Sequence, residues 1–308
     1  MISKSLTSQV YHCSKHLRSL YVLSRQNSTA VITGGASGIG LALAKSAVSR
    51  DYNIVLVDIE ESRLSEAVSE LKVSSDRILA VKCDVSKEDE MASLADKVFD
   101  RFGSVQLLCN NAGVGATKMS WEHTKSDWDW VLGVNMWSII HANRFFIPRM
   151  LKQDVRSRIL NTASAAGLIS TPGMIAYNVS KHAVVTMSET LYHELRDVNA
   201  PIDVSVLCPA FIPTGIAASH RNRPPALSTD CEDMMASEYK DANMKYAAGL
   251  VKAVKSGKKS ADEVAEHVFE AMDKGDFYIV PHRKILGAVH QRCDDIVNLK
   301  SPTVMVPA

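Results

Sequence analysis

Short apolar runs alternate along the chain with longer amphipathic segments, starting near residue 28. The runs are rich in β-branched residues and predict strands at residues 29–33, 53–57, 77–81, 105–109, 158–162, 202–207 and 277–280. Between them, apolar positions recur at helical spacing and predict helices at residues 38–49, 61–71, 88–102, 134–151 and 175–197. This alternation predicts an α/β fold with a parallel, doubly wound sheet.

The predicted strand at residues 53–57 reads Asn-Ile-Val-Leu-Val. It is apolar on both faces, as a sheet covered by helices on both sides requires. The sequence contains neither an internal repeat nor a low-complexity linker. Its 308 residues are near the size at which one hydrophobic core stops growing. We therefore expect a single domain over residues 28–308.

One stretch, residues 213–259, interrupts the alternation between the sixth and seventh predicted strands. It contains Pro213, Pro224 and Pro225, followed by a helical pattern that includes methionines. Long insertions in compact domains are usually functional or disordered. This one follows a strand at the carboxyl edge of the sheet, where ligands bind in open α/β folds. We interpret it as a lid over the substrate, inserted after the sixth strand.

The opening segment of the chain carries positive charge only, because the first acidic residue is Asp51. The cations before residue 30 are Lys4, Lys15, Arg18 and Arg25. On a helix of about 100° per residue, the apolar residues share one face opposite these cations. A basic, serine-rich, acid-free amphipathic segment is typical of a transit peptide. We predict a mitochondrial import segment at residues 1–27; a disordered tail, an upstream start codon, a membrane-surface helix and a cytoplasmic protein are the alternatives.

Composition narrows the classes of function. Lys and Arg number 35 against 34 Asp and Glu, which gives no general attraction for nucleic acid, so we expect a small-molecule substrate. The six cysteines are scattered without a C-x-x-C pair, which fits reduced thiols and predicts neither a disulfide framework nor a metal site. No apolar run reaches the roughly 18 residues needed to cross a bilayer. No transmembrane segment is expected.

A glycine-rich turn joins the first predicted strand to the first helix and reads Thr33-Gly-Gly-Ala-Ser-Gly-Ile-Gly40. Glycines let the backbone approach a pyrophosphate, and a helix N-terminus favours its charge. Asp58 ends the second strand, where a carboxylate can accept hydrogen bonds from an adenosine ribose. A dinucleotide site is therefore predicted. A structural turn and a helix N-cap are the alternatives for the glycines and for Asp58, respectively.

The order and spacing of several short motifs resemble the short-chain dehydrogenase/reductase family over residues 29–212. The motifs are Gly34-x-x-x-Gly38-x-Gly40, Asn110-Asn-Ala-Gly113, Asn135, Ser164 and Tyr177-x-x-x-Lys181. The resemblance implies a Rossmann-like domain that uses NAD or NADP to oxidise an alcohol or reduce a carbonyl. It also implies a homo-oligomer, either a dimer or a tetramer. The catalytic residues that it implies are Asn135, Ser164, Tyr177 and Lys181.

The resemblance also implies a set of cofactor-binding positions. They are Gly34, Ser37, Gly38, Ile39, Gly40, Asp58, Asp84, Val85, Asn111, Ala112, Gly113, Tyr177, Lys181, Pro209 and Thr214. For Asp84, capping of the segment that starts at Ser86 is the alternative. The chain departs from the family pattern twice: Ala210 follows Pro209 where glycine is usual, and Pro213 precedes Thr214. These departures concern the shape of the loop near the nicotinamide.

Tyr177 and Lys181 are suited to proton transfer because residues four apart share one face of a helix. Lowering the pKa of a tyrosine from about 10 to about 7.5 takes roughly 3.4 kcal/mol. A unit charge about 5 Å away supplies roughly 3.3 kcal/mol at an effective dielectric constant of about 20. We therefore expect Lys181 to lower the pKa of Tyr177, which would act as general acid and base. Ser164 would hold the substrate oxygen, and Asn135 would position a water.

We predict an oxidoreductase that transfers hydride between NAD and a secondary alcohol or its ketone. Apolar residues around Ser164 favour a largely apolar substrate; they are Ala165, Ala166, Leu168, Ile169 and Met174. An NADPH-dependent carbonyl reductase and a non-catalytic dinucleotide-binding scaffold are the alternatives.

NAD is expected over NADP because Asp58 should lie against the ribose. There it would repel the extra phosphate by roughly 3 kcal/mol at about 5 Å and an effective dielectric constant near 20. Ser37 and Ile59 are neutral, which leaves Arg63 as the only close cation in the sequence. We expect Arg63 to pair with Glu60 or to face solvent.

Overall fold

The computed structural model describes residues 28–153, 155–228 and 237–304. The predicted import segment at residues 1–27 lies outside the described residues, as do residues 229–236 of the predicted lid. None of the described helices is long and apolar enough to cross a bilayer.

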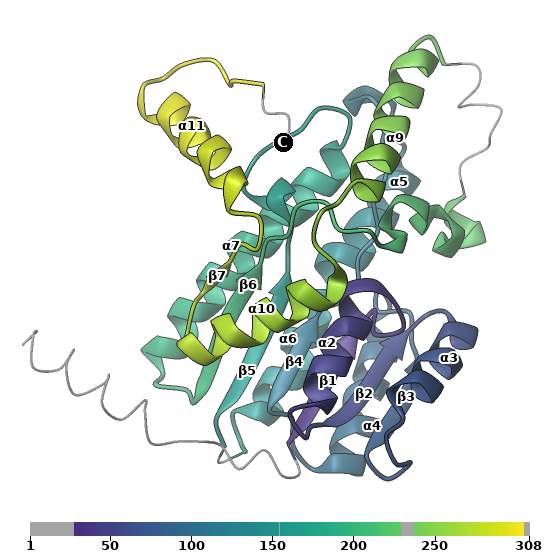
Figure 1. Cartoon of the computed structure of the whole chain (residues 1–308), viewed down its shortest axis with the longest axis vertical. Coiled ribbons are helices and arrows are strands. Elements are labelled where there is room, and N and C mark those ends of the chain that lie inside the picture. Colours follow the sequence, from purple (N-terminus) through teal and green to yellow (C-terminus); the bar gives the residue numbers. More distant parts are fainter. Residues whose placement is uncertain (1–27, 154, 229–236, 305–308) are drawn as a thin grey trace, which may run out of the picture.

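Seven parallel strands form one sheet in the order β3-β2-β1-β4-β5-β6-β7 (Figure 1). The strands are β1 (Thr29–Thr33), β2 (Asn53–Asp58), β3 (Ile78–Lys82), β4 (Leu107–Asn110), β5 (Ser157–Thr162), β6 (Ile202–Leu207) and β7 (Tyr278–Ile279). Each predicted strand is present, with its ends shifted by at most two residues. The order runs outward in both directions from β1 and β4, which is the doubly wound topology. The predicted fold class is confirmed.

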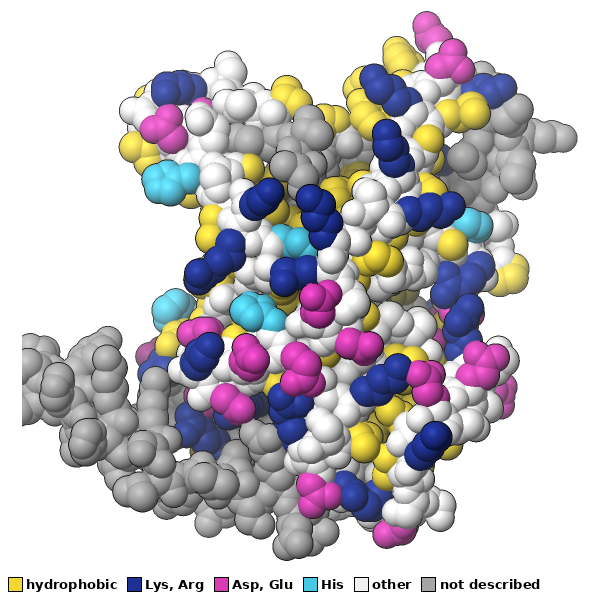
Figure 2. Space-filling model, viewed as in Figure 1, with side chains coloured by type: hydrophobic (Ala, Val, Ile, Leu, Met, Phe, Trp, Pro, Cys, Tyr) yellow, Lys and Arg dark blue, Asp and Glu magenta, His cyan; other side chains and the backbone are white. Residues whose placement is uncertain are grey.

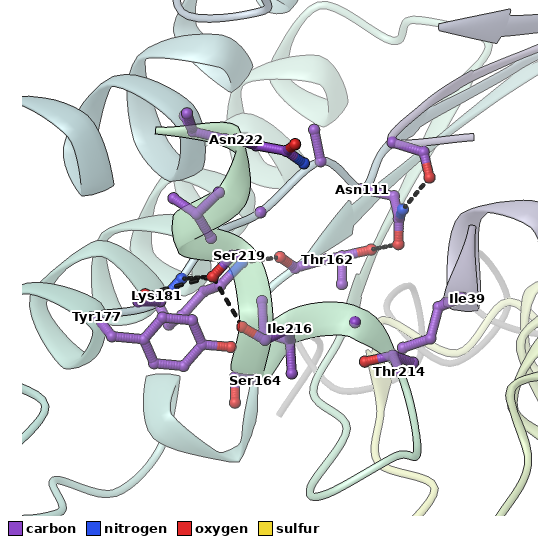
Figure 3. Close-up of a pocket in the computed structure, with 18 of the residues that line it drawn as sticks. Ile39, Asn111, Thr162, Ser164, Tyr177, Lys181, Thr214, Ile216, Ser219 and Asn222 are labelled. Carbon is purple, nitrogen blue, oxygen red and sulfur yellow. Dashed lines mark hydrogen bonds between the residues drawn. The ribbon is translucent and has the colours of Figure 1, made fainter. Parts of the chain in front are cut away.

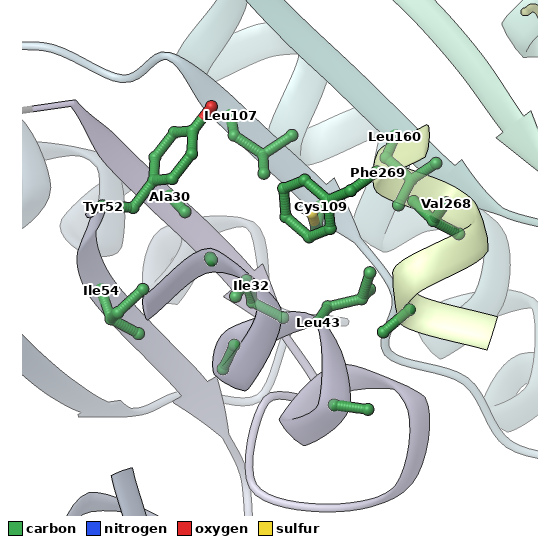
Figure 4. Close-up of a cluster of buried hydrophobic side chains, with 14 of the residues drawn as sticks. Ala30, Ile32, Leu43, Tyr52, Ile54, Leu107, Cys109, Leu160, Val268 and Phe269 are labelled. Atoms are coloured by element: carbon green, nitrogen blue, oxygen red, sulfur yellow. The ribbon is translucent and has the colours of Figure 1, made fainter. Parts of the chain in front are cut away.

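Helices cover both faces of the sheet. One face carries α2 (Gly38–Val48), α3 (Glu61–Leu71) and α10 (Ala261–Lys274), and the other carries α4 (Glu88–Phe102), α6 (Ser138–Met150) and α7 (Ile175–Asp197). Alternate strand residues supply the two cores, because successive side chains of a strand point to opposite faces. Ile32 packs with Phe269 of α10 on the first face (Figure 4), whereas Val31 packs on the second.

The predicted helix at residues 134–151 is divided in the structure. A π-helical turn, η2 (Gly133–Trp137), links α5 (Lys125–Leu132) to α6. Such turns occur frequently at functional sites, and this one carries Asn135. The hydrophobic period alone did not reveal the change in helix type, because a single π turn shifts the apolar positions by only one residue.

The segment between β6 and α10 contains η4 (Gly215–Asn222), η5 (Pro225–Leu227) and α9 (Lys240–Lys255). After β7 comes α11 (Leu286–Val297), a helix that the sequence pattern did not predict. α9 and α11 project from the body of the molecule, and apolar side chains are visible on both projections in Figure 2. Exposed apolar side chains of these helices include Met244 and Val251 on α9 and Leu286 and Ile296 on α11. Exposed apolar patches often mark contacts with other molecules, and assembly into a homo-oligomer stays a prediction.

Candidate active site

A cavity of about 400 Å³ opens at the carboxyl ends of the strands. The glycine turn after β1 forms one wall and the start of α7 forms another, with η4 lying across the opening (Figure 3). Of the predicted site residues, the cavity is lined by Gly34, Ser37, Gly38, Ile39, Asp58, Asp84, Val85, Asn111, Ala112, Gly113, Ser164, Tyr177, Lys181, Pro209 and Thr214. Gly40 and Asn135 lie behind this wall. The fold therefore brings together residues that are almost 180 positions apart in sequence, because the carboxyl ends of parallel strands meet at one edge.

The turn between β1 and α2 can be built only from glycines at its critical positions. Gly34 and Gly38 have φ of +62° and +54°, a region that other residues rarely adopt. A Cβ atom on Gly40 would lie 2.0 Å from the Gly34 carbonyl oxygen. The N-cap of α2, Ser37, makes no side-chain capping bond, so the first amides of α2 are left for a ligand. An anion such as a pyrophosphate fits this cradle.

Thr33 and Asn111 hold the glycine turn against the loop after β4. The Thr33 hydroxyl accepts hydrogen bonds from the amides of Asn111 (2.9 Å) and Ala112 (3.1 Å). The Asn111 side chain donates to the Thr33 carbonyl (3.0 Å) and accepts from the Thr162 hydroxyl (3.3 Å) (Figure 3). The Asn111 side chain therefore links the carboxyl ends of β1, β4 and β5. Thr33 was missed as a site residue, although it directly precedes the glycine motif.

Asp58 lies between the glycine turn and the start of α3. Its carboxylate accepts hydrogen bonds from the amides of Ala36 and Glu60, both at 3.1 Å. Burial raises the pKa of Asp58, and these amides oppose that effect. Asp84 accepts bonds through a single oxygen from the Ser86 amide (3.0 Å) and hydroxyl (2.7 Å). Asp84 therefore makes the predicted alternative contact with Ser86 and also faces the cavity.

The expectation that Arg63 is the only cation close to this end of the cavity is wrong. Arg221 of η4 reaches Glu60 with its Nη2 at 2.7 Å, and the Asn222 side chain donates to the same carboxylate at 2.9 Å. Arg63 pairs with Glu60 at 3.3 Å, as predicted. Arg221 is 161 positions from Glu60, so no local pattern could have identified it.

Ser164, Tyr177 and Lys181 converge on one side of the cavity (Figure 3). The Lys181 ammonium lies 5.7 Å from the centre of the Tyr177 ring and donates to the Thr162 carbonyl at 2.8 Å. The Ser164 hydroxyl accepts from the Ala166 amide at 3.1 Å, which fixes it at the start of a short turn. The Tyr177 and Ser164 hydroxyls lie on the same side of the cavity (Figure 3). A substrate oxygen can therefore approach two hydroxyl groups at once.

Burial dominates the acid–base properties of this group. It lowers the pKa of Lys181 from 10.5 to about 8. It also raises the pKa of Tyr177, against a smaller lowering effect of the Ser164 side chain. The expected lowering of the Tyr177 pKa by Lys181 is thus not present in the cofactor-free protein. The reason is that a poorly solvated site disfavours phenolate and ammonium alike.

The Asn135 side chain is bonded to the loop after β4. Its oxygen accepts from the Val114 amide (2.8 Å), and its nitrogen donates to the Val114 carbonyl (2.9 Å) and the Ser180 hydroxyl (3.0 Å). These contacts position residues 113–115 against α7. The predicted role of Asn135 in positioning a water stays a prediction.

The loop after β6 is held by two contacts that the sequence did not indicate. The Ala210 amide donates to Nδ1 of His282 at 3.2 Å, across 72 positions of sequence. Thr214 lies against the glycine turn, since a Cβ atom on Gly38 would lie 3.1 Å from the Thr214 methyl group. The two departures from the family pattern are therefore accommodated within a loop that still borders the cavity.

The wall beyond Ser164 and Tyr177 is largely apolar. Of the residues predicted to surround the substrate, Ala165, Ala166, Ile169 and Met174 line the cavity, whereas Leu168 packs against a core cluster. Additional apolar lining comes from Phe211, Ile212, Ile216, Leu227, Leu250 and Val254.

α9 supplies the last two of these residues. The Tyr246 ring of α9 packs against Gly173, where an added Cβ atom would lie 2.4 Å from the ring. Part of the predicted lid thus forms a wall of the cavity.

Comparison with known proteins identifies several similar chains. A dehydrogenase/reductase of CLA biosynthesis from Lactiplantibacillus plantarum is 33% identical over 275 residues, covering 89% of this chain and 95% of that protein. D-beta-hydroxybutyrate dehydrogenase from Rhizobium meliloti is 36% identical, covering 60% of this chain and 72% of that protein. A short-chain dehydrogenase/reductase from Burkholderia phymatum, crystallised with NAD, superposes with a TM-score of 0.87 at 41% identity, covering 93% of this chain and 100% of that one.

The model of the family described as short chain dehydrogenase matches residues 28–225. This range contains the glycine turn and every residue of the Ser164, Tyr177 and Lys181 group. The chain belongs to the short-chain dehydrogenase family and is a nicotinamide-dependent oxidoreductase of the alcohol and ketone type.

Proposed function

We propose that this protein prefers NAD and oxidises a largely apolar secondary alcohol, or reduces the corresponding ketone, with Tyr177 as the proton-transferring residue. One observation carries the proposal. The hydroxyls of Ser164 and Tyr177, with Lys181 behind them, line the same cavity as the glycine turn. A dinucleotide held by that turn and a substrate held by the hydroxyls would therefore share one enclosed space.

The roles follow from the contacts of each side chain. Tyr177 would take the alcohol proton during oxidation and return it to the ketone oxygen during reduction. Ser164 would donate to the same oxygen and stabilise the charge that develops on it. Bound NAD would supply the hydride acceptor and a positive charge. Lys181, held by the Thr162 carbonyl, would keep its ammonium beside the Tyr177 ring and favour the phenolate.

Charge at the adenosine end supports the preference for NAD. Asp58 and Glu60 both border the cavity, and Asp58 accepts only from amides that belong to its own turn and the glycine turn. Arg221, the opposing cation, is already paired with Glu60. The Burkholderia phymatum relative was crystallised with NAD, which supports the same choice. A reductase that prefers NADPH is the main alternative.

The apolar wall supports a largely apolar substrate. Contact with each additional methylene contributes about 0.8 kcal/mol, which corresponds to roughly a fourfold gain in affinity. Met174 at the start of α7 and Leu250 and Val254 of α9 line the cavity and provide that contact. The alkyl part of a substrate would therefore lie between the start of α7 and α9.

The test is an absorbance assay at the nicotinamide band with a homologous series of 2-alkanols and 2-alkanones, using NAD and NADP in turn. We expect kcat/KM to rise severalfold per methylene over the first members of the series, and to be at least tenfold higher with NAD. Tyr177→Phe is the control and should lower kcat by a factor of about 10² to 10⁴ while cofactor affinity stays similar. A flat chain-length series contradicts the apolar substrate, and full turnover by Tyr177→Phe contradicts the mechanism.

A further inference from the structure

An ion pair joins the turn after β2 to η4 at the adenosine end of the cavity. Glu60 accepts from Arg221 through both oxygens, at 2.7 Å from Nη2 and at 3.3 Å from Nε. Asn222 adds a third hydrogen bond to the same carboxylate. The pairing with Arg221 is the largest cause of the lowered pKa of Glu60. This is the two-pronged geometry in which an arginine recognises a carboxylate most specifically.

Two further N–H donors of Arg221 are used within η4. Its Nη1 donates to the carbonyls of Gly215 (3.2 Å) and Ala218 (3.0 Å) within η4. The guanidinium also lies close to Gly215, because a Cβ atom there would be 3.3 Å from both terminal nitrogens. Arg221 is therefore held by its own helix on one side and by Glu60 on the other. Removal of Glu60 would leave the guanidinium in place with two donors free.

The pair of Glu60 and Arg221 lies beside Asp58, the residue that is predicted to bind the adenosine ribose. The Glu60 amide donates to Asp58, and Asp58, Glu60 and Arg221 all border the cavity. At the other end of the same segment, Thr214 lies against Gly38 of the glycine turn. Residues 214–222 thus run from the pyrophosphate cradle to the turn after β2. Among the described residues that line the cavity, Arg221 is the only arginine.

We infer that Glu60 is a specificity-determining residue that excludes NADP by holding Arg221. Paired with Glu60, the guanidinium gives its Nε–H and one Nη2–H to that carboxylate, and the negative charge of Glu60 offsets its attraction for a ribose 2′-phosphate. Released from Glu60, it presents two donors in the geometry that suits a phosphate. This inference rests on the proposed dinucleotide function and adds a residue pair that selects between the two cofactors.

The test measures cofactor affinity directly, by quenching of tryptophan fluorescence in the full chain with NAD, NADH, NADP and NADPH. Glu60→Gln removes the charge and one of the two acceptors, so it should free one donor of Arg221 and tighten binding of NADP and NADPH by about tenfold, the size of one charge-assisted hydrogen bond. Binding of NAD and NADH should change by less than about threefold by the same reasoning, since neither carries the extra phosphate. Glu61→Gln, which removes a neighbouring carboxylate paired with Lys82, is the matched control and should leave all four affinities unchanged.

Two double variants separate the release of Arg221 from the mere loss of a negative charge. The gain should disappear in Glu60→Gln/Arg221→Gln and persist in Glu60→Gln/Arg63→Gln, because only Arg221 borders the cavity. A gain that survives the loss of Arg221 overturns the inference, as does equal weakening of all four cofactors by Glu60→Gln. These outcomes leave the proposed function standing, since turnover with NAD and its loss in Tyr177→Phe are measured separately.

Discussion

Replacing Lys181 with methionine should change how the stability of the cofactor-free protein depends on pH. Lys181 is only 3% exposed, and burial lowers its pKa from 10.5 to about 8. Burial therefore disfavours the protonated form of Lys181 in the folded protein. Methionine has a similar length and no charge, so Lys181→Met removes the effect without opening a large cavity.

The magnitude follows from linkage between protonation and folding. At about 1.36 kcal/mol per pH unit, the interval between 10.5 and about 8 corresponds to roughly 3 kcal/mol. Between these pH values the unfolded chain keeps the Lys181 proton and the folded chain has lost it, so stability rises with pH. Below pH 8 both states carry the proton, and the full cost of the buried charge is present.

Denaturation with urea between pH 7 and pH 10.5, without cofactor, measures the effect. The free energy of unfolding of the unsubstituted protein minus that of Lys181→Met should increase by roughly 3 kcal/mol over this range. The buried thiol Cys83, whose pKa is raised to about 12, also affects both proteins but cancels in the difference. Cys208 interacts with Lys181, so both proteins are compared in a Cys208→Ala background. In Lys181→Met the Thr162 carbonyl loses the hydrogen bond from Lys181, which changes the free energy of unfolding by an amount that does not depend on pH. A difference that is constant with pH would refute the assignment of a destabilising charge to Lys181.

Three further predictions concern the glycine turn, the loop after β6 and the lid. Gly40→Ala should weaken cofactor binding by more than about tenfold, since its Cβ would lie 2.0 Å from a carbonyl oxygen. Gly249→Ala is the control and should leave cofactor binding unchanged, because the space around Gly249 is open. Equal cofactor affinities of the two variants in a fluorescence titration would contradict this prediction. His282→Leu should lower kcat/KM severalfold because the Ala210 amide loses its acceptor, and His282→Gln, which can still accept, should restore most of it; identical kinetics for the two variants would argue against a positioning role. Hydrogen exchange in residues 240–255 should slow when cofactor and product analogue bind together, and unchanged exchange would contradict closure of the lid.

The positions of the strands and the catalytic motifs could be predicted because they depend on local chemistry. A period of two or an unbroken apolar run is decided by neighbouring residues, and every predicted strand is present. The glycine turn could be located for a similar reason: its backbone conformation favours glycine at Gly34 and Gly38. Tyr177 and Lys181 share a face of one helix at a spacing of four, so their proximity is also a local property.

The electrostatics of the site could not be predicted in the same way. As an isolated pair at a fixed dielectric constant, Tyr177 and Lys181 predict a lowered tyrosine pKa. In the folded chain both groups are poorly solvated, so the pKa of Tyr177 is raised and that of Lys181 is lowered. Desolvation depends on everything that packs around a group, and no spacing within α7 reports it.

The sequence by itself therefore determined the α/β alternation, the glycine turn and the placement of Tyr177 and Lys181 on one face of a helix. Only the tertiary structure decided that Arg221 pairs with Glu60 and that His282 accepts a hydrogen bond from the Ala210 amide. It also decided that Asn135 bonds to Val114 and that α9 packs against Gly173. The physical reason is the range of the interactions involved. Backbone conformation and hydrophobic period are decided within a few residues, whereas ion pairs, burial and cavity walls join segments that are distant in sequence and meet only when the sheet has formed.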